Sequence, residues 1–433
     1  MTDQLADAPR PRSWRVPTAV RPLSGEVVVP GSKSVTNRAL LLAALGTGPS
    51  LLRAPLRSRD TELMAAALRG LGTDVAEVGP DWAVTPRDLR GPAEVDAGLA
   101  GTVMRFVPAV ATLATGDVHV DGDARARERP LAPLIAALRR LGADIDDAGR
   151  GALPVTVHGT GGIAGGEVDI DASASSQLLS ALLLPAARWG AGVRVRHVGT
   201  RAVPNAPHVR MTVEMLRERG VPVGDDRPGV WVVQPAEIAG RDEEIEPDLS
   251  SAAPFLAAAL VTGGEVRTRW KPTSCQPGAE LPTLLSAFGA RTHLTDGVLT
   301  VSGGEVTGAT LDLRNAGELT PVLAAVAAVA GTPSTLTGIG YLRGHETDRL
   351  AALARELTGL GASVQELADG LTISPGPLTG GPFHSYADHR LVMAAAVIGL
   401  VVPGVEVDDA SAVTKTYPDF VEQWSEFVGG AAS

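Results

Sequence analysis

The sequence has little cysteine and no long apolar run. Cys275 is the single cysteine among 433 residues, which excludes an internal disulfide framework and indicates a reducing compartment, for which we expect the cytoplasm. No run reaches the roughly 18 apolar residues that a membrane helix needs, so we expect no membrane partner. Residues 1–12 mix acidic side chains with proline, and we interpret them as a loose tail and not as a signal peptide.

Basic residues are outnumbered, and lysine is rare among them. The chain has 38 Lys and Arg against 49 Asp and Glu, a net charge of −11. General nucleic-acid binding requires a basic surface and is therefore not expected. The only lysines are Lys33, Lys271 and Lys415. In a chain that otherwise uses arginine, each is a candidate for a task that needs a compact ammonium group.

Two series of helical segments recur through the chain about every 70 residues. Apolar segments with helical spacing end at Gly46, Gly116, Gly190, Gly263, Gly331 and Gly404. Amphipathic segments end, in the same rhythm, at Gly72, Gly142, Gly220, Gly289, Gly361 and Gly429. Because strand-like segments and Asp-Gly turns lie between them, the sequence predicts six repeats of strand, helix, strand, helix, strand, strand.

The ends of the chain indicate how the repeats are grouped. The sixth repeat lacks a closing hairpin, whereas the strands expected before residue 31 have no helix before them, so we expect these strands to complete the C-terminal half. A charged segment at residues 241–247 makes a second crossing. We therefore predict an α/β (α+β) fold of two lobes with buried helices and outer sheets. The lobes are residues 1–30 plus 246–433 and residues 31–245, with the active site in the cleft between them.

Positive charge gathers where the helices begin. If the buried helices of a lobe run in parallel, their N-termini meet on one face, and two such faces make a positively polarised cleft. Cations at helix starts are Lys33, Arg38, Arg105, Arg129, Arg349, Arg390 and Lys415. Two phosphates and two carboxylates carry about five to six negative charges. This match favours a pair of small polyanions over a single nucleotide.

Some helix starts allow simpler explanations. Asp248 and Glu318 suit helix caps and need no further role. A Walker-type phosphate loop is not predicted near Lys33, because the glycine spacing is one residue too long and a serine precedes the lysine. A cluster of histidines beside acidic residues could hold a metal, but nearby cations oppose one, so we expect no metal: His345, His384 and His389, beside Glu346 and Asp388.

Seven motifs carry a resemblance to a known family. They are GSKSVTNRALLLAAL, AGTVMR, RERP, ASSQ, RGHETDRL, YADHR and KTYPDF, and they span nearly the whole chain. In this order they resemble the enolpyruvyltransferase family, in particular its EPSP synthase branch. The resemblance implies an inside-out α/β barrel in each lobe, with three βαβαββ units per lobe.

The resemblance also implies an activity in the shikimate pathway of aromatic amino acid biosynthesis. The enolpyruvyl group of phosphoenolpyruvate is transferred to the 5-hydroxyl of shikimate 3-phosphate by addition and elimination, giving 5-enolpyruvylshikimate 3-phosphate and phosphate. No cofactor is implied, and the partners are these two small molecules, with glyphosate as an inhibitor of the family. We expect a monomer.

Site residues follow from the matching motifs. Catalytic roles are implied for Lys33, Glu318, Glu346 and His389. The shikimate 3-phosphate site is implied for Lys33, Ser34, Arg38, Ser175, Ser176, Gln177, Asn205, Glu318 and His345. The phosphoenolpyruvate site is implied for Lys33, Gly101, Arg105, Arg129, Gln177, Arg349, Arg390 and Lys415. Within these sets, Glu318 matches the acid near the 5-hydroxyl and Glu346 the acid near the methylene carbon.

Departures from the family pattern leave some questions open. Glu318 occupies the position of an Asp that is common in the family, and Asn205 the position of a phosphate-binding Ser. At three further positions the family frequently has Tyr, Asn and Lys, where this chain has His208, Tyr341 and His345 respectively. The proton donor thus stays undecided. One alternative is the UDP-N-acetylglucosamine enolpyruvyltransferase, which bears a cysteine where this chain has DGDARARE. Another is a non-catalytic repeat scaffold, which would have no reason to place two of three lysines in these motifs.

Overall fold

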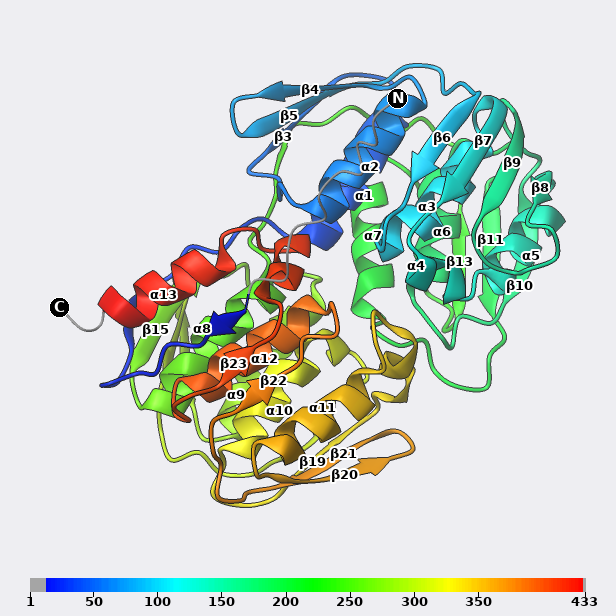
Figure 1. The fold of residues 1–433 in the computed structure, drawn as a ribbon. Coiled ribbons are helices and arrows are strands. Elements are labelled where there is room, and N and C mark those ends of the chain that lie inside the picture. Colours follow the sequence, from blue (N-terminus) through cyan, green and yellow to red (C-terminus); the bar gives the residue numbers. More distant parts are fainter. Residues whose placement is uncertain (1–12, 431–433) are drawn as a thin grey trace, which may run out of the picture.

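The buried apolar side chains form two separate cores. The computed structural model describes residues 13–430, and the expected tail, residues 1–12, lies outside the described residues. Within the described part, one core is drawn from residues 35–245 and the other from residues 14–29 together with 249–428. Figure 1 shows the corresponding two lobes, each with helices inside and strands outside.

Three buried helices fill the centre of the first lobe. They are α1 (Lys33–Ala44), α3 (Gly101–Ala111) and α6 (Gln177–Ala186), and nearly all their residues are buried. A helix that is apolar almost all round has no face for solvent, so it packs inside. The outer helices, each with one buried face, are α2 (Arg59–Gly70), α5 (Ala132–Arg140) and α7 (Pro207–Arg217).

Three four-stranded sheets cover the first lobe, and their orders are β14-β3-β5-β4, β6-β7-β9-β8 and β10-β11-β13-β12. In each, the first pair is parallel and the others are antiparallel. This is the pairing that a βαβαββ unit produces. The strands are β3 (Ser50–Arg53), β4 (Asp74–Val78), β5 (Asp81–Thr85), β6 (Ala93–Asp96), β7 (Thr115–Asp121), β8 (Ile145–Asp146), β9 (Val155–Thr160), β10 (Gly166–Ile170), β11 (Val193–His197), β12 (Val223–Gly224), β13 (Val230–Val233) and β14 (Glu243–Glu244).

The second lobe repeats this plan around its own buried helices. These are α8 (Leu249–Thr262), α10 (Thr320–Ala328) and α12 (His389–Gly399), with outer helices α9 (Leu281–Ala287), α11 (Arg349–Gly359) and α13 (Phe420–Gly430). Its sheets have the orders β16-β17-β15-β2, β18-β19-β21-β20 and β1-β23-β22. The strands are β1 (Trp14–Arg15), β2 (Ser24–Glu26), β15 (Glu265–Arg269), β16 (Arg291–Thr295), β17 (Val298–Ser302), β18 (Thr310–Asp312), β19 (Ser334–Thr337), β20 (Ser363–Leu367), β21 (Gly370–Ser374), β22 (Pro382–Phe383) and β23 (Glu406–Val407).

The two crossings of the chain lie side by side. The N-terminal strands complete sheets of the C-terminal half, as predicted: β2 pairs with β15 and β1 with β23. Gly31 forms an antiparallel bridge with Pro247, and the Ser32 N–H donates to the Glu246 carbonyl at 2.8 Å. Just before the second crossing, β14 adds the first strand to the first lobe's own sheet by pairing with β3.

Some boundaries differ from those predicted. The repeat pattern contains no helix directly before Arg129, but Ala124–Glu128 form a short helix there, α4. Helix α11 begins at Arg349, because η3 (Gly340–Gly344) precedes it and Asp348 caps it. Gly429 lies inside α13, whereas the other five glycines of its series have positive φ just past a helix. In the part of the chain described, no helix is both long and apolar enough to cross a membrane.

Candidate active site between the lobes

A small cavity of about 60 Å³ lies between the lobes, where buried helices of both lobes begin. One lobe supplies the starts of α1, α3 and α6, and the other supplies η2 (Gly317–Leu319), the segment before α11 and the start of α12. The lining is almost entirely polar: Lys33, Ser34, Gly101, Thr102, Arg105, Arg129, Ala174, Ser175, Gln177, Glu318, Gly344, His345, Glu346, Arg349, His389 and Arg390. The structure therefore brings most of the residues expected at the site to one place.

Lys33, at the start of α1, contacts residues of both lobes. Its backbone N–H donates to the Asp248 carboxylate of the other lobe at 3.2 Å. Its Nζ lies 3.6 Å from Asp60 Oδ2, and the side chain is only 17% exposed. Because the ammonium faces the cavity and is held from one side only, it remains able to bind an anion there.

Arg105 and Arg129 carry unsatisfied N–H groups at the cavity. Arg105 Nη1 donates to Gln177 Oε1 at 2.9 Å, but its Nε, and the Nε and Nη1 of Arg129, are buried without a hydrogen-bond partner among the described residues. Burial, with the neighbouring Arg129, lowers the pKa of Arg105 well below its ordinary value. Buried, unpaired guanidinium groups of this kind are costly, and an anionic ligand would satisfy them.

Glu346 lies within a network of cations. Its Oε1 accepts from Lys415 Nζ at 2.6 Å and its Oε2 from Arg349 Nη2 at 3.0 Å. Burial alone would raise the pKa of Glu346, but Lys415, Arg349 and Arg129 together lower it well below its ordinary value. Arg349 is in turn held by Asp388 at 2.7 Å. Glu346 is therefore an ionised carboxylate at neutral pH.

Glu318 is the second ionised acid of the cavity. Its Oε2 lies 3.1 Å from Arg390 Nη2 and 3.4 Å from Ser250 Oγ. Burial would raise its pKa, but the surrounding cations, Arg390 first, lower it to about 2. His208 Nε2 lies 3.7 Å from Glu318 Oε1, and burial lowers the pKa of His208 to about 4.

Two neutral histidines complete the lining. His389 is buried, and neither ring nitrogen has a hydrogen-bond partner in residues 13–430. Burial, together with Arg390, lowers its pKa well below the ordinary value, and burial does the same for His345. A neutral imidazole with both nitrogens unpartnered can donate or accept a proton at a bound ligand.

Some expected residues lie behind the cavity wall. Arg38 is buried in α1, and its guanidinium donates to Thr212, Ser180 and two backbone carbonyls, so in this conformation it does not line the cavity. Lys415 does not line the cavity but donates to Glu346, which does. Asn205 also lies behind the wall, where its Oδ1 accepts from the Gly317 N–H at 3.3 Å. Ser176 is buried at the start of α6.

Three residues that hold the site together were given no site role in the sequence analysis. Asp60 is 1% exposed and lies 3.6 Å from Lys33 Nζ and 3.9 Å from Lys415 Nζ, so it holds the two lysines near each other. Thr102 Oγ1 accepts from Asn37 Nδ2 at 2.7 Å, which joins the starts of α3 and α1. Asp388 orients Arg349. Asp60 and Asp388 stand at helix starts, where an acid is expected for capping alone, so the sequence carried no separate signal.

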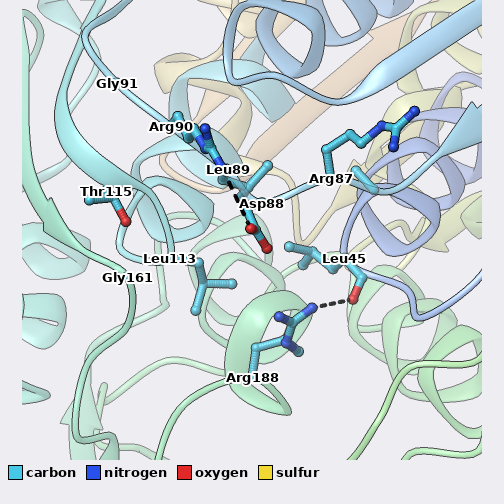
Figure 2. Close-up of a pocket in the computed structure, with 11 residues that line it drawn as sticks. Leu45, Arg87, Asp88, Leu89, Arg90, Gly91, Leu113, Thr115, Gly161 and Arg188 are labelled. Atoms are coloured by element: carbon cyan, nitrogen blue, oxygen red, sulfur yellow. Dashed lines mark hydrogen bonds and ion pairs between the residues drawn. The ribbon is translucent and has the colours of Figure 1, made fainter.

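A larger depression lies at the opposite ends of the same helices. Its volume is about 540 Å³, and it contains none of the predicted site residues. Figure 2 shows Arg188 donating to the Leu45 carbonyl there, at the C-terminal end of α1. A cation at a helix C-terminus is explained by the helix dipole. We therefore assign the chemistry to the cavity between the lobes.

The fold and the site define a class: two-lobed proteins of inside-out α/β barrels with a polyanion site in the cleft. Solved structures share this fold over almost their whole length. An EPSP synthase from Acinetobacter baumannii has a TM-score of 0.79 at 24% identity and covers 97% of this chain and 98% of its own. The enolpyruvyl transferase NikO from Streptomyces tendae has a TM-score of 0.76 at 18% identity, covering 96% and 98%.

Sequence comparison identifies the family. The family model of EPSP synthase (3-phosphoshikimate 1-carboxyvinyltransferase) matches residues 17–424. A 3-phosphoshikimate 1-carboxyvinyltransferase from Kocuria rhizophila is 51% identical over 420 residues, which cover 94% of each chain. The chain belongs to the EPSP synthase family. The UDP-N-acetylglucosamine enzyme and the non-catalytic scaffold are therefore not favoured.

Proposed function

We propose that this protein transfers the enolpyruvyl group of phosphoenolpyruvate to the 5-hydroxyl of shikimate 3-phosphate. The observation that carries the proposal is the meeting of cations from both lobes with two ionised carboxylates in one buried cavity. Five positive side chains line it, Lys33, Arg105, Arg129, Arg349 and Arg390, and Lys415 holds the carboxylate of Glu346. Membership of the EPSP synthase family supports the same reaction.

Phosphoenolpyruvate fits the end of the cavity beside α3. Arg105 and Arg129 present their unpartnered N–H groups there, and Gly101 lets the backbone approach a ligand. Arg349 and Lys415 belong to the other lobe and are oriented by Glu346. Charge-assisted bonds from these groups would hold the phosphate and the carboxylate and stabilise the phosphate as it leaves.

The acceptor fits the end beside α6 and Glu318. In the addition step the 5-oxygen bonds to the central carbon of phosphoenolpyruvate, the 5-hydroxyl proton passes to Glu318, and the methylene carbon gains a proton. An ionised Glu318 can accept that proton, because its pKa of about 2 keeps it deprotonated at neutral pH. His208 and Ser34 lie beside it and would position the acceptor.

Glu346 and Lys415 suit the proton transfers at the methylene carbon. Because Glu346 is ionised, it would act as the base that removes a methyl proton when phosphate leaves in the elimination step. The Lys415 ammonium, which donates to Glu346 Oε1 at 2.6 Å, would supply the proton that is added earlier. Lys33 would stabilise charge on both substrates, and His389, neutral and unpartnered, would contact the transferred group.

Some finer points are also proposals. The two apolar cores support a division into residues 1–30 plus 246–433 and residues 31–245. The single cysteine supports a cytoplasmic location. Glyphosate, a compact anion, would compete for the cationic end of the cavity. We propose a monomer, because residues of one chain supply both halves of the site.

The experiment is a phosphate-release assay with phosphoenolpyruvate and three acceptors. Shikimate 3-phosphate should support turnover, and UDP-N-acetylglucosamine should not, with unphosphorylated shikimate far weaker. In D₂O, deuterium should enter the enolpyruvyl methylene of the product, because that carbon is protonated and then deprotonated. Phosphate release with UDP-N-acetylglucosamine alone, or none with any acceptor, would overturn the proposal.

A further inference from the structure

A second cavity between the lobes has no role in the mechanism above. Its volume is about 230 Å³. One wall comes from the segments after β10 and β11, and the other from the segments around η2 and η3 and the turn between β20 and β21. The lining residues are Ser173, Arg201, Ala202 and Pro204 from the first lobe and Arg314, Gly338, Tyr341 and Asp369 from the second. Two arginines from opposite lobes therefore open onto one space.

The second cavity adjoins the acceptor end of the central one. Tyr341 lines the second cavity, and its ring centroid lies 5.7 Å from that of His345, which lines the first. Asn205, expected at the acceptor phosphate, donates its N–H to the Arg314 carbonyl at 2.9 Å. Its φ of 47° is one that asparagine tolerates better than most residues. A group extending from the acceptor ring past Asn205 would thus enter the second cavity.

The acceptor end of the central cavity offers little positive charge to a phosphate. A phosphate carries about −1.5 to −2 charges. Lys33 lines the cavity but is shared between the two proposed substrates, and the other side chains expected near the phosphate are uncharged: Ser175, Ser176, Gln177 and Asn205. His345, which stands where the family has lysine, is kept neutral by burial. Arg38 is already bonded to Thr212 and Ser180. The charge must come from elsewhere.

Arg201 is positioned to supply part of it. Its backbone is fixed, because its carbonyl accepts from Ser173 Oγ at 3.2 Å and lies 2.9 Å from His197 Nε2. Its guanidinium makes no close ion pair or hydrogen bond with another described residue, and it interacts with the Asp171 carboxylate only at longer range. Ser173, on the same first-lobe wall, lies two residues before Ser175 in the chain, so hydroxyl groups continue from one cavity to the next.

Arg314 is held only loosely. Its guanidinium lies 3.2 Å from Asp312 Oδ2, and both side chains are more than half exposed, so this pair contributes little. The one acid that lines the cavity, Asp369, accepts the Gly340 N–H at 2.8 Å through Oδ1. Arg314 can therefore exchange its surface partner for a more highly charged ligand.

We propose that Arg201 and Arg314 bind the 3-phosphate of the acceptor, one from each lobe, and so select phosphorylated acceptors in this protein. The proposal rests on the proposed function and adds two specificity residues to it. Together they replace the cation that is absent at His345. Because they stand on opposite lobes, the phosphate joins the lobes at the acceptor end of the cleft.

Steady-state kinetics of Arg201→Gln, Arg314→Gln and the double variant test this. Each single change should raise KM for shikimate 3-phosphate about tenfold and the double change about a hundredfold, with KM for phosphoenolpyruvate changed less than threefold. The preference for shikimate 3-phosphate over shikimate, as a ratio of kcat/KM, should fall in parallel. Arg201→Lys should restore part of the affinity, because it keeps the charge without the planar fork.

The matched control is Arg194→Gln, which removes a partly exposed arginine of β11 that lies 3.8 Å from Glu167 and lines neither cavity between the lobes. It should leave every constant unchanged. If the wild type uses shikimate 3-phosphate but the double variant keeps its KM and its preference, the inference is wrong and the proposed function stands. An equal rise in KM for both substrates would also overturn it. A wild type without activity would instead refute the proposed function.

Discussion

Gly101 is a residue at which one methyl group should separate the two substrates. A Cβ there would lie 3.1 Å from Arg105 Nη1 and Gln177 Oε1 and 3.2 Å from Arg129 Nη2. These side chains would have to shift away from the positions proposed for phosphoenolpyruvate. Gly101→Ala should therefore weaken binding of phosphoenolpyruvate and glyphosate about tenfold or more, with shikimate 3-phosphate nearly unaffected, as measured by calorimetry.

Gly359→Ala is the control for that change, because a Cβ at Gly359 would meet nothing within 4 Å. It should leave all three affinities as they are. An equal loss of all three ligands in Gly101→Ala would point to a folding defect and not to a crowded anion pocket.

Lys33 should not be replaceable by another cation. Its ammonium stands between the two proposed substrates and lies 3.6 Å from the buried Asp60. A planar guanidinium cannot occupy that space with the same geometry. We expect Lys33→Arg to lower kcat about a hundredfold or more, with the fold verified by circular dichroism. Near-normal turnover would show that Lys33 is only a general positive charge.

Glu346→Gln should affect turnover more than binding. The amide keeps the shape of the side chain but cannot take up a proton, and general acid–base groups contribute about a hundred- to ten-thousandfold. Glu356→Gln is a matched control, since Glu356 of α11 is also buried but accepts from Tyr386 Oη and the His384 N–H and does not line the cavity. If Glu346→Gln retains kcat and loses only affinity, Glu346 merely orients Arg349 and Lys415.

Individual site residues could be predicted from the sequence only where they lie within a recognisable motif. The cations were found because they stand at helix starts in a chain with few lysines. Asp60 was missed, since an acid after Ser58 at a helix start is explained by the dipole alone. The burial that makes Asp60 a partner of two lysines comes from the packing of α2 against α1 and the opposite lobe, which only the folded chain shows.

Among the secondary-structure elements, α8 depends on a cap that also serves the crossing. Asp248 Oδ1 accepts from the Ser251 N–H at 2.9 Å and from Ser250 Oγ at 2.7 Å, while Oδ2 accepts from the Lys33 N–H. Loss of such a cap costs about 0.5–2 kcal/mol. Asp248→Ala should lower the free energy of unfolding by about 2 kcal/mol in urea denaturation.

Asp248→Asn keeps one oxygen acceptor at the cap and should lose less than half as much. If the two variants are equally stable, the Ser251 bond is not what fixes the start of α8. If both are as stable as the wild type, the cap contributes nothing to the lobe.

The long elements could be predicted and the short ones could not. The six buried helices were found because their residues are apolar on every side. Strand β14 has two residues and exists only through its pairing with β3, so its own sequence contains no strand signal. Helix α4 was missed for a related reason: its five residues are stabilised by contacts such as Arg125 to the Glu346 carbonyl of the other lobe.

At the scale of the whole molecule, the lobes meet through polar contacts around the cavity. Lys415 Nζ lies 3.3 Å from the Leu99 carbonyl, and Arg125 Nε is 3.3 Å from the Glu346 carbonyl. The six-fold repeat predicted the two lobes, but it could not predict how closely they approach, because no sequence period encodes an interface between them. Cations of both lobes repel across the cleft, and dianionic ligands would neutralise them.

The central claim is that both lobes build one polyanion site around the acceptor, and small-angle X-ray scattering tests it most directly. Saturating shikimate 3-phosphate should reduce the radius of gyration of the wild type, with bending at the crossings near Gly31 and Glu246. Phosphoenolpyruvate alone should have much less effect, because Arg349 and Lys415 are already held by Glu346. A radius of gyration unchanged by saturating shikimate 3-phosphate would contradict the claim that the acceptor draws the lobes together.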